Sequence, residues 1–140
     1  MKKTIHIVLK IVLSLLLIMP IVGALGVFPP PTRELYNTDI AFTFIEILTQ
    51  VAYINYIMSV VNIVAVILLW TKREAPAALL ITPITVNILA FHIFLDGGLF
   101  TGGAALGNIL LLLNAYFLWK NRMKYKDLWT KGGVHQISDK

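Results

Sequence analysis

The sequence predicts an all-α transmembrane four-helix bundle, and the prediction depends on composition, on apolar runs and on the placement of charge. The chain has 140 residues, of which 58% are hydrophobic and 14% are charged, whereas a soluble domain has about 25% charged residues. Four apolar runs are each close to the roughly 20 residues that a helix needs to cross a bilayer. Eleven of the twelve lysines and arginines lie at the N-terminus, in one short loop or after Trp119.

The first predicted span covers residues 5–27 and follows two lysines at the N-terminus. A cleaved signal peptide is the alternative, because the basic start and the Gly-Ala-Leu-Gly end would suit one. The apolar run is longer than the 7–15 residues of an ordinary signal core, which favours a retained helix. Three consecutive prolines after Phe28 then end the helix, because proline lacks the backbone donor that a helix needs. They predict an ordered outer loop.

Residues 40–70 are too long for one straight span and divide into two segments. The first segment, up to about Ala52, carries Glu46 one helical turn before Gln50. It is predicted to be an amphipathic helix at the membrane interface or at the mouth of a cavity. The second span then covers residues 53–70, with aromatic residues near both ends, where interfacial belts usually lie.

The third and fourth spans are predicted at residues 76–95 and 101–119. A hydrophilic turn at residues 71–74 precedes the third span, and an Asp-Gly-Gly sequence ends it. Residues 1–130 therefore form one membrane domain, and residues 131–140 form a polar tail.

The basic clusters predict the orientation through the positive-inside rule. They place the N-terminus, the C-terminus and the turn before the third span in the cytoplasm. Four spans with both termini cytoplasmic agree with every cluster. Cleavage of the first span would move the N-terminus outside and would still agree with the other clusters, so charge alone leaves that alternative open.

Several classes of function are disfavoured by what the chain lacks. It has no cysteine, which excludes disulfides, thiolate metal sites and dithiol redox chemistry. Its three histidines are His6, His92 and His135. They lie at opposite membrane faces and in the tail, so they form neither a haem-binding pair nor a metal cluster. The basic residues lie at the ends of the predicted spans and do not form one face with aromatic residues beside it. This distribution argues against nucleic acid as a partner. No catalytic constellation is found, and the sequence leans against an enzyme.

Polar residues inside the spans are predicted to pack between helices. Asn62 and Asn87 lie at similar depths near mid-membrane, and the favoured interpretation is an amide–amide hydrogen bond that sets helix register. The alternative is one polar wall of a quinone or lipid cavity. Pro83 is predicted to kink the third span. Gly103 and Gly107 are predicted to allow close helix packing, either within the bundle or at a dimer seam.

A polar cluster is predicted at the outer end of the bundle. His92 and Asp96 are four residues apart and share a helix face, and Asn108 and Glu46 are placed at comparable depth. One interpretation is a hydrogen-bonded cluster that closes the mouth of the bundle. The other is a proton-handling or head-group site for a quinone, since a neutral imidazole exchanges protons near physiological pH.

The order and spacing of several segments resemble a known family. LLWTKR, PAALL, PITVNI and FHIFL follow one another between Leu68 and Leu95, FPPP begins at Phe28, and WKNRMKYKDL begins at Trp119. Together they resemble the DoxX family of small bacterial membrane proteins over most of residues 5–128.

The resemblance implies a four-helix bundle in the bacterial inner membrane. The family takes its name from a subunit of a thiosulfate:quinone oxidoreductase. The resemblance therefore implies an association with a membrane redox or envelope complex. Since no catalytic constellation is found, the chain is expected to be a non-catalytic subunit or scaffold of such a complex, with quinone or lipid contact and with protein partners or further copies of itself. Many relatives have a glutamate near the position of Asn62, so an acid–base role attached to that glutamate does not carry over.

Two alternatives stay open. One is a quinone-linked oxidoreductase component whose own site uses His92, Asp96 and Asn87. The other is a small-solute transporter, which the lack of a clear inverted repeat weakens.

Overall fold

The computed structural model describes residues 2–126, and every regular element in that range is a helix. The predicted all-α class is therefore confirmed. The polar tail predicted at residues 131–140 lies outside the described residues. The α-helices are α1 (Lys2–Ala24), α2 (Asp39–Val51), α3 (Tyr53–Trp70), α4 (Glu74–Phe94) and α5 (Ala105–Lys120), and 3-10 turns form η1 (Arg33–Leu35) and η2 (Arg122–Tyr125).

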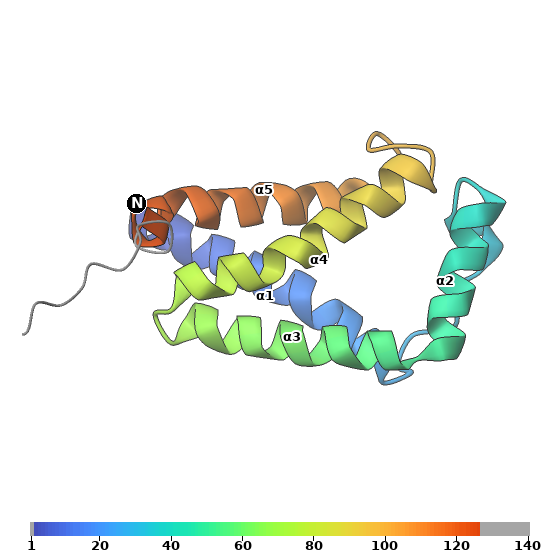
Figure 1. The fold of residues 1–140 in the computed structure, drawn as a ribbon, viewed down its shortest axis with the longest axis horizontal. Coiled ribbons are helices and arrows are strands. Elements are labelled where there is room, and N and C mark those ends of the chain that lie inside the picture. Colours follow the sequence, from blue (N-terminus) through green and yellow to red (C-terminus); the bar gives the residue numbers. More distant parts are fainter. Residues whose placement is uncertain (1, 127–140) are drawn as a thin grey trace, which may run out of the picture.

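Helices α1, α3, α4 and α5 run alongside one another, and α2 lies across one end of them (Figure 1). We call the end that carries α2, the proline-rich loop and the α4–α5 turn the loop end. The opposite end carries the start of α1, the α3–α4 turn and the end of α5 (Figure 1). We call it the basic end, because Lys10, Lys72, Arg73 and Lys120 lie there.

Three helices, α1, α3 and α4, are long and apolar enough to cross a membrane. Helix α5 is apolar but has 16 residues, which corresponds to about 24 Å at a rise of 1.5 Å per residue. The predicted fourth span begins at Thr101, whereas the helix begins at Ala105 because the residues between them form turns. The helices share one apolar core that consists of Leu13, Leu17, Ala65, Leu69, Ala77, Ala78, Ile81, Leu110, Leu113 and Phe117.

The break between α2 and α3 falls at Ala52. This residue has φ +51°, which an L side chain rarely adopts, so the chain changes direction there and the two helices separate. Helix α2 begins after Thr38, whose side-chain oxygen accepts a hydrogen bond from the backbone N–H of Ala41 at 3.1 Å, as an N-cap does. The predicted division of residues 40–70 into two helices is therefore confirmed.

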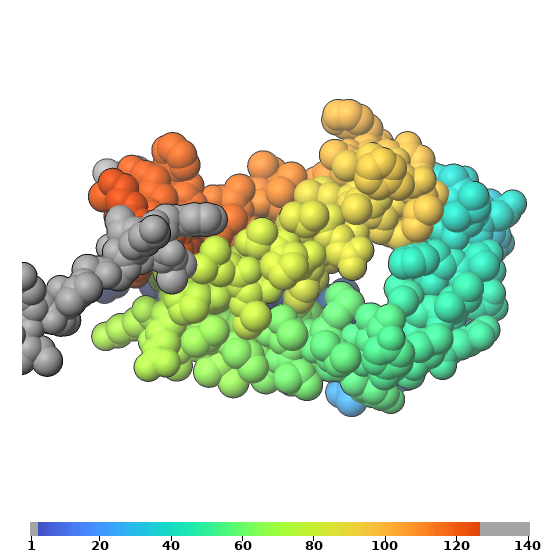
Figure 2. Space-filling view, in the orientation of Figure 1, coloured from blue at the N-terminus to red at the C-terminus, as the bar shows by residue number. Residues whose placement is uncertain are grey.

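Helix α2 stands away from the other helices on one side. In the space-filling view an opening lies between α2, α3 and α4 (Figure 2). Helix α4 itself continues through Pro83 from end to end.

Candidate functional site

The end of α4 carries a buried imidazole–carboxylate pair. The Nδ1 atom of His92 lies 3.0 Å from Oδ2 of Asp96, and the two residues are 8% and 1% exposed. Gly97 and Gly98 follow with φ of +83° and +108°, values that glycine adopts without strain. They let the chain turn away directly after the pair.

The loop before α2 holds the other side of this carboxylate. The backbone N–H of Asn37 donates to Oδ1 of Asp96 at 2.8 Å, and the Asn37 side chain donates to the Asp96 carbonyl at 3.0 Å. The Thr38 hydroxyl donates to the carbonyl of Leu95. Sequence reasoning missed these partners: an Asn-Thr-Asp sequence signals a helix start, but not the distant helix end that it contacts.

The remaining members of the predicted outer cluster do not join the pair. The Asn108 side chain donates to the carbonyl of Leu99 at 2.7 Å and so stabilises the α4–α5 turn. Glu46 is exposed on α2, and none of the hydrogen bonds or ion pairs within residues 2–126 connects it to His92 or Asp96. The structure therefore brings together two of the four predicted residues.

Two glycines lie against the pair, Gly103 in the turn before α5 and Gly107 in its first turn. A Cβ atom placed on Gly103 would lie 3.3 Å from Oδ2 of Asp96, and one on Gly107 would lie 2.9 Å from Cγ2 of Ile88. The Gly107 Cβ would also lie 3.8 Å from Nε2 of His92. Both glycines therefore allow a close approach to α4 within this chain, which is one of the two roles predicted for them.

The imidazole of His92 also lines a cavity of about 410 Å³ between α1, α4 and α5, which we call the His92 groove. Among the residues that line it, His92 alone has a polar side chain. No hydrogen bond of Nε2 is found among residues 2–126. The lining residues are Val12, Leu15, Leu16, Met19, Pro20, Ile88, His92, Gly103, Leu106, Gly107 and Leu110.

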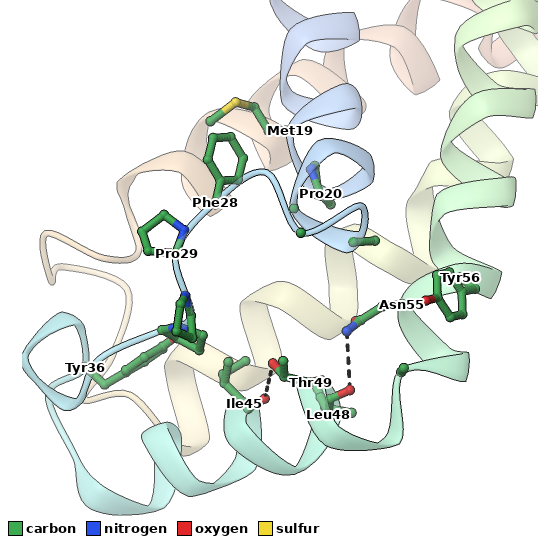
Figure 3. Close-up of a pocket in the computed structure, with 16 residues that line it drawn as sticks. Met19, Pro20, Phe28, Pro29, Tyr36, Ile45, Leu48, Thr49, Asn55 and Tyr56 are labelled. Atoms are coloured by element: carbon green, nitrogen blue, oxygen red, sulfur yellow. Dashed lines mark hydrogen bonds between the residues drawn. The ribbon is translucent and has the colours of Figure 1, made fainter.

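A second and larger cavity, of about 830 Å³, lies at the loop end between the end of α1, the proline-rich loop, α2 and α3 (Figure 3). Met19 and Pro20 line both cavities. Two polar side chains of the larger cavity bind nearby carbonyl groups, Asn55 that of Leu48 and Thr49 that of Ile45 (Figure 3).

Two tyrosines, Tyr36 and Tyr56, also line the larger cavity. Burial, and secondly the negative charge of Asp96, raise the pKa of Tyr36. The hydroxyl therefore stays neutral at physiological pH. With no charged side chain in its lining, this cavity suits apolar groups.

The structure corrects the predicted hydrogen bond between Asn62 and Asn87. Asn62 is 1% exposed, and its Oδ1 atom has no hydrogen-bond partner among the described residues. Asn87, in contrast, lies on an exposed face of α4. The inward face carries Ile81, Thr85 and His92, and a residue two positions after Thr85 points about 200° away from it at 3.6 residues per turn.

A different asparagine connects the helices at this depth. Asn114 of α5 is buried, and its side chain donates to the hydroxyl oxygens of Thr82 and Thr85 on α4 at 3.2 and 3.4 Å. Sequence reasoning missed it. Its position inside an apolar run, with two threonines one turn apart on the preceding span, was the available signal.

We expect Asn114→Leu to lower the free energy of unfolding by about 1 kcal/mol, because it removes an interhelical hydrogen-bonding group. Asn87→Leu, the matched control on the exposed face of α4, is expected to change it by less than about 0.5 kcal/mol. Reversible unfolding in mixed detergent–dodecyl sulfate micelles measures both. An equal loss for the two variants would restore Asn87 as the helix-connecting residue.

A second polar network joins α1, α4 and α5 at the basic end. Glu74 is the first residue of α4. Its Oε1 atom lies 2.7 Å from Nζ of Lys10 and 2.8 Å from Nε2 of His6, and its Oε2 atom lies 3.0 Å from Nζ of Lys120. Lys10 also donates to the carbonyl of Leu69 at 3.0 Å. One carboxylate thus connects three helices through three basic side chains.

Within residues 2–126 no three side chains of the His, Cys, Asp and Glu types lie together as metal ligands would. Comparisons with protein-family models, with curated proteins and with solved structures gave no match. The His92 groove and the helices that enclose it are the features of the described residues that bear on function.

Proposed function

We propose that this chain is a multi-pass protein of the bacterial inner membrane, of DoxX type, with four spans and both termini cytoplasmic. In this proposal it is a non-catalytic subunit or scaffold of a membrane redox or envelope complex. It holds a quinone or a similar lipid-soluble molecule in the His92 groove. The observation that carries the proposal is the single imidazole nitrogen in an otherwise apolar groove.

The exposed side chains support four spans. Large apolar residues are exposed near the middle of each of the four long helices: Leu15 in α1, Val60 in α3, Val86 in α4 and Leu112 in α5. Large apolar side chains exposed at the middle of every long helix favour contact with lipid over contact with water. Helix α5 therefore presents the same kind of surface as the three helices of membrane length.

The charged residues support the orientation. The start of α1, the α3–α4 turn and the end of α5 all lie at the basic end (Figure 1). Positively charged loops stay on the cytoplasmic side, so the basic end is the cytoplasmic end of this proposal. The loop end then faces outward.

The composition of the groove supports binding of a lipid-soluble molecule. Small-molecule sites are mostly apolar cavities of about 300–1,000 Å³ with few placed polar groups, and the His92 groove fits that description. A ligand there meets one hydrogen-bonding side chain. With no second polar side chain in the lining to share a chemical step, the groove favours a binding role over catalysis.

Mass spectrometry of lipids that co-purify with the full chain in mild detergent tests the ligand. We expect the wild type to carry a quinone or related molecule in a near-equimolar amount to the protein. In His92→Phe we expect the bound amount to fall at least several-fold. Leu112→Phe, which changes an exposed residue outside the groove, is expected to retain it. Equal amounts in all three proteins, or none in the wild type, would refute the proposed site.

A further inference from the structure

We infer that the His92 groove selects a ligand that donates a hydroxyl group to Nε2, so that it prefers a hydroquinone to the corresponding quinone. The inference rests on the proposed function, because it concerns the ligand of the same groove. The new element is that the ligand acts as a hydrogen-bond donor in the groove.

The partners of Asp96 determine which imidazole nitrogen carries the proton. A carboxylate only accepts hydrogen bonds. One oxygen of Asp96 accepts from the backbone N–H of Asn37 at 2.8 Å, and the other lies 3.0 Å from Nδ1 of His92. Nδ1 is therefore the protonated nitrogen, as in other carboxylate–imidazole pairs. In the neutral imidazole this leaves a lone pair on Nε2.

The imidazole lines the groove, and its Nε2 atom has no hydrogen-bond partner within residues 2–126. Nε2 lies 3.8 Å from the position that a Cβ atom on Gly107 would occupy, so the absence of a side chain at Gly107 leaves space beside the ring. All other side chains of the lining are apolar. A hydroxyl group in the groove can donate a hydrogen bond to Nε2. A quinone carbonyl is itself an acceptor, as unprotonated Nε2 is, and it finds no hydrogen-bond donor among these side chains.

The ligand can reach this site from the lipid phase. Leu15 of α1 and Leu106 of α5 both line the groove, and both are 58% exposed on the surface of the chain. One residue of the lining on α1 and one on α5 are therefore accessible from outside the chain, in the region that the proposed function places in the bilayer. A hydrocarbon tail would remain among apolar groups while the hydroxyl head lies against His92.

Three probes with the same ring and the same decyl tail test the inference on the purified full chain in nanodiscs: a decyl benzoquinone, its hydroquinone under anaerobic reduction, and the dimethyl ether of that hydroquinone. Equilibrium dialysis measures their dissociation constants. We expect the hydroquinone to bind about tenfold more tightly than the other two, because only it donates a hydrogen bond to Nε2. In His92→Phe the three probes should bind equally.

The outcomes separate the two proposals. If the quinone or the ether binds as tightly as the hydroquinone, the inference fails while the proposed function stands. If no probe binds, the proposed function fails as well. Should His92→Phe not fold, ¹⁵N-histidine spectra of the wild type keep the question open to test, since the hydroquinone must shift the unprotonated Nε2 signal of His92 and the ether must leave it unchanged.

Discussion

Replacement of Asp96 by alanine is expected to lower the free energy of unfolding by about 3 kcal/mol. The side chain is 1% exposed, and its two oxygens hold the backbone N–H of Asn37 and Nδ1 of His92. Removal leaves the buried Nδ1–H of His92 and the backbone N–H of Asn37 without their acceptor, and a buried donor that loses its partner costs about 1–3 kcal/mol. The loop before α2 should also detach from the end of α4. Thermal unfolding and hydrogen exchange of the Asn37 amide measure the two effects.

Two comparison variants separate the contribution of the carboxylate from that of any acidic residue at the loop end. Asp96→Asn keeps an oxygen for the Asn37 amide and is expected to cost about 1 kcal/mol, the typical value for one hydrogen bond. Glu46→Ala removes an exposed acid on α2 and should change stability by less than about 0.5 kcal/mol. If Asp96→Ala were no worse than Glu46→Ala, the carboxylate would not hold the loop end together.

Replacement of Glu74 by glutamine is expected to lower the free energy of unfolding by about 2 kcal/mol. Its carboxylate contacts Lys10, Lys120 and His6, so the neutral amide leaves two ammonium groups close together. Loss of one partner from a buried ion pair costs about 3–5 kcal/mol. The expected value is smaller because the Lys120 side chain is 39% exposed and solvent screens it. Chemical unfolding in mixed micelles measures the loss.

The matched control is the exposed ion pair between Arg33 and Asp39. The Asp39 side chain is 88% exposed, and exposed pairs contribute at most about 1 kcal/mol. Asp39→Asn should therefore have a small effect. Equal effects of Glu74→Gln and Asp39→Asn would show that the network at the basic end is dispensable for stability.

The length and placement of apolar runs predicted the helices well. The second span was predicted at residues 53–70, and α3 covers the same residues. This agreement has a local cause, because the conformation of Ala52 divides α2 from α3. The first and fourth spans were each predicted a few residues too long at the loop end, since glycine-rich turns are as apolar as the helices beside them.

The rotation of each helix about its axis could not be predicted in the same way. Depth along the span places Asn62 and Asn87 at one level, yet depth contains no information on the direction in which a side chain points. Asn87 lies on the exposed face of α4, and Asn114 connects α4 to α5 in its place. In a span that is apolar on all sides the pattern that would reveal the inward face is weak.

By itself, the sequence determined the helical class, the order of the apolar helices, the collection of basic residues at their ends and the shared face of His92 and Asp96. These properties depend on composition and on spacing within one helix. Only the tertiary structure decided that Asn37 holds the carboxylate, that Glu74 joins three helices and that the imidazole of His92 lines an apolar groove. Each of these contacts joins residues more than ten positions apart or on separate helices, so packing determines them and local sequence does not.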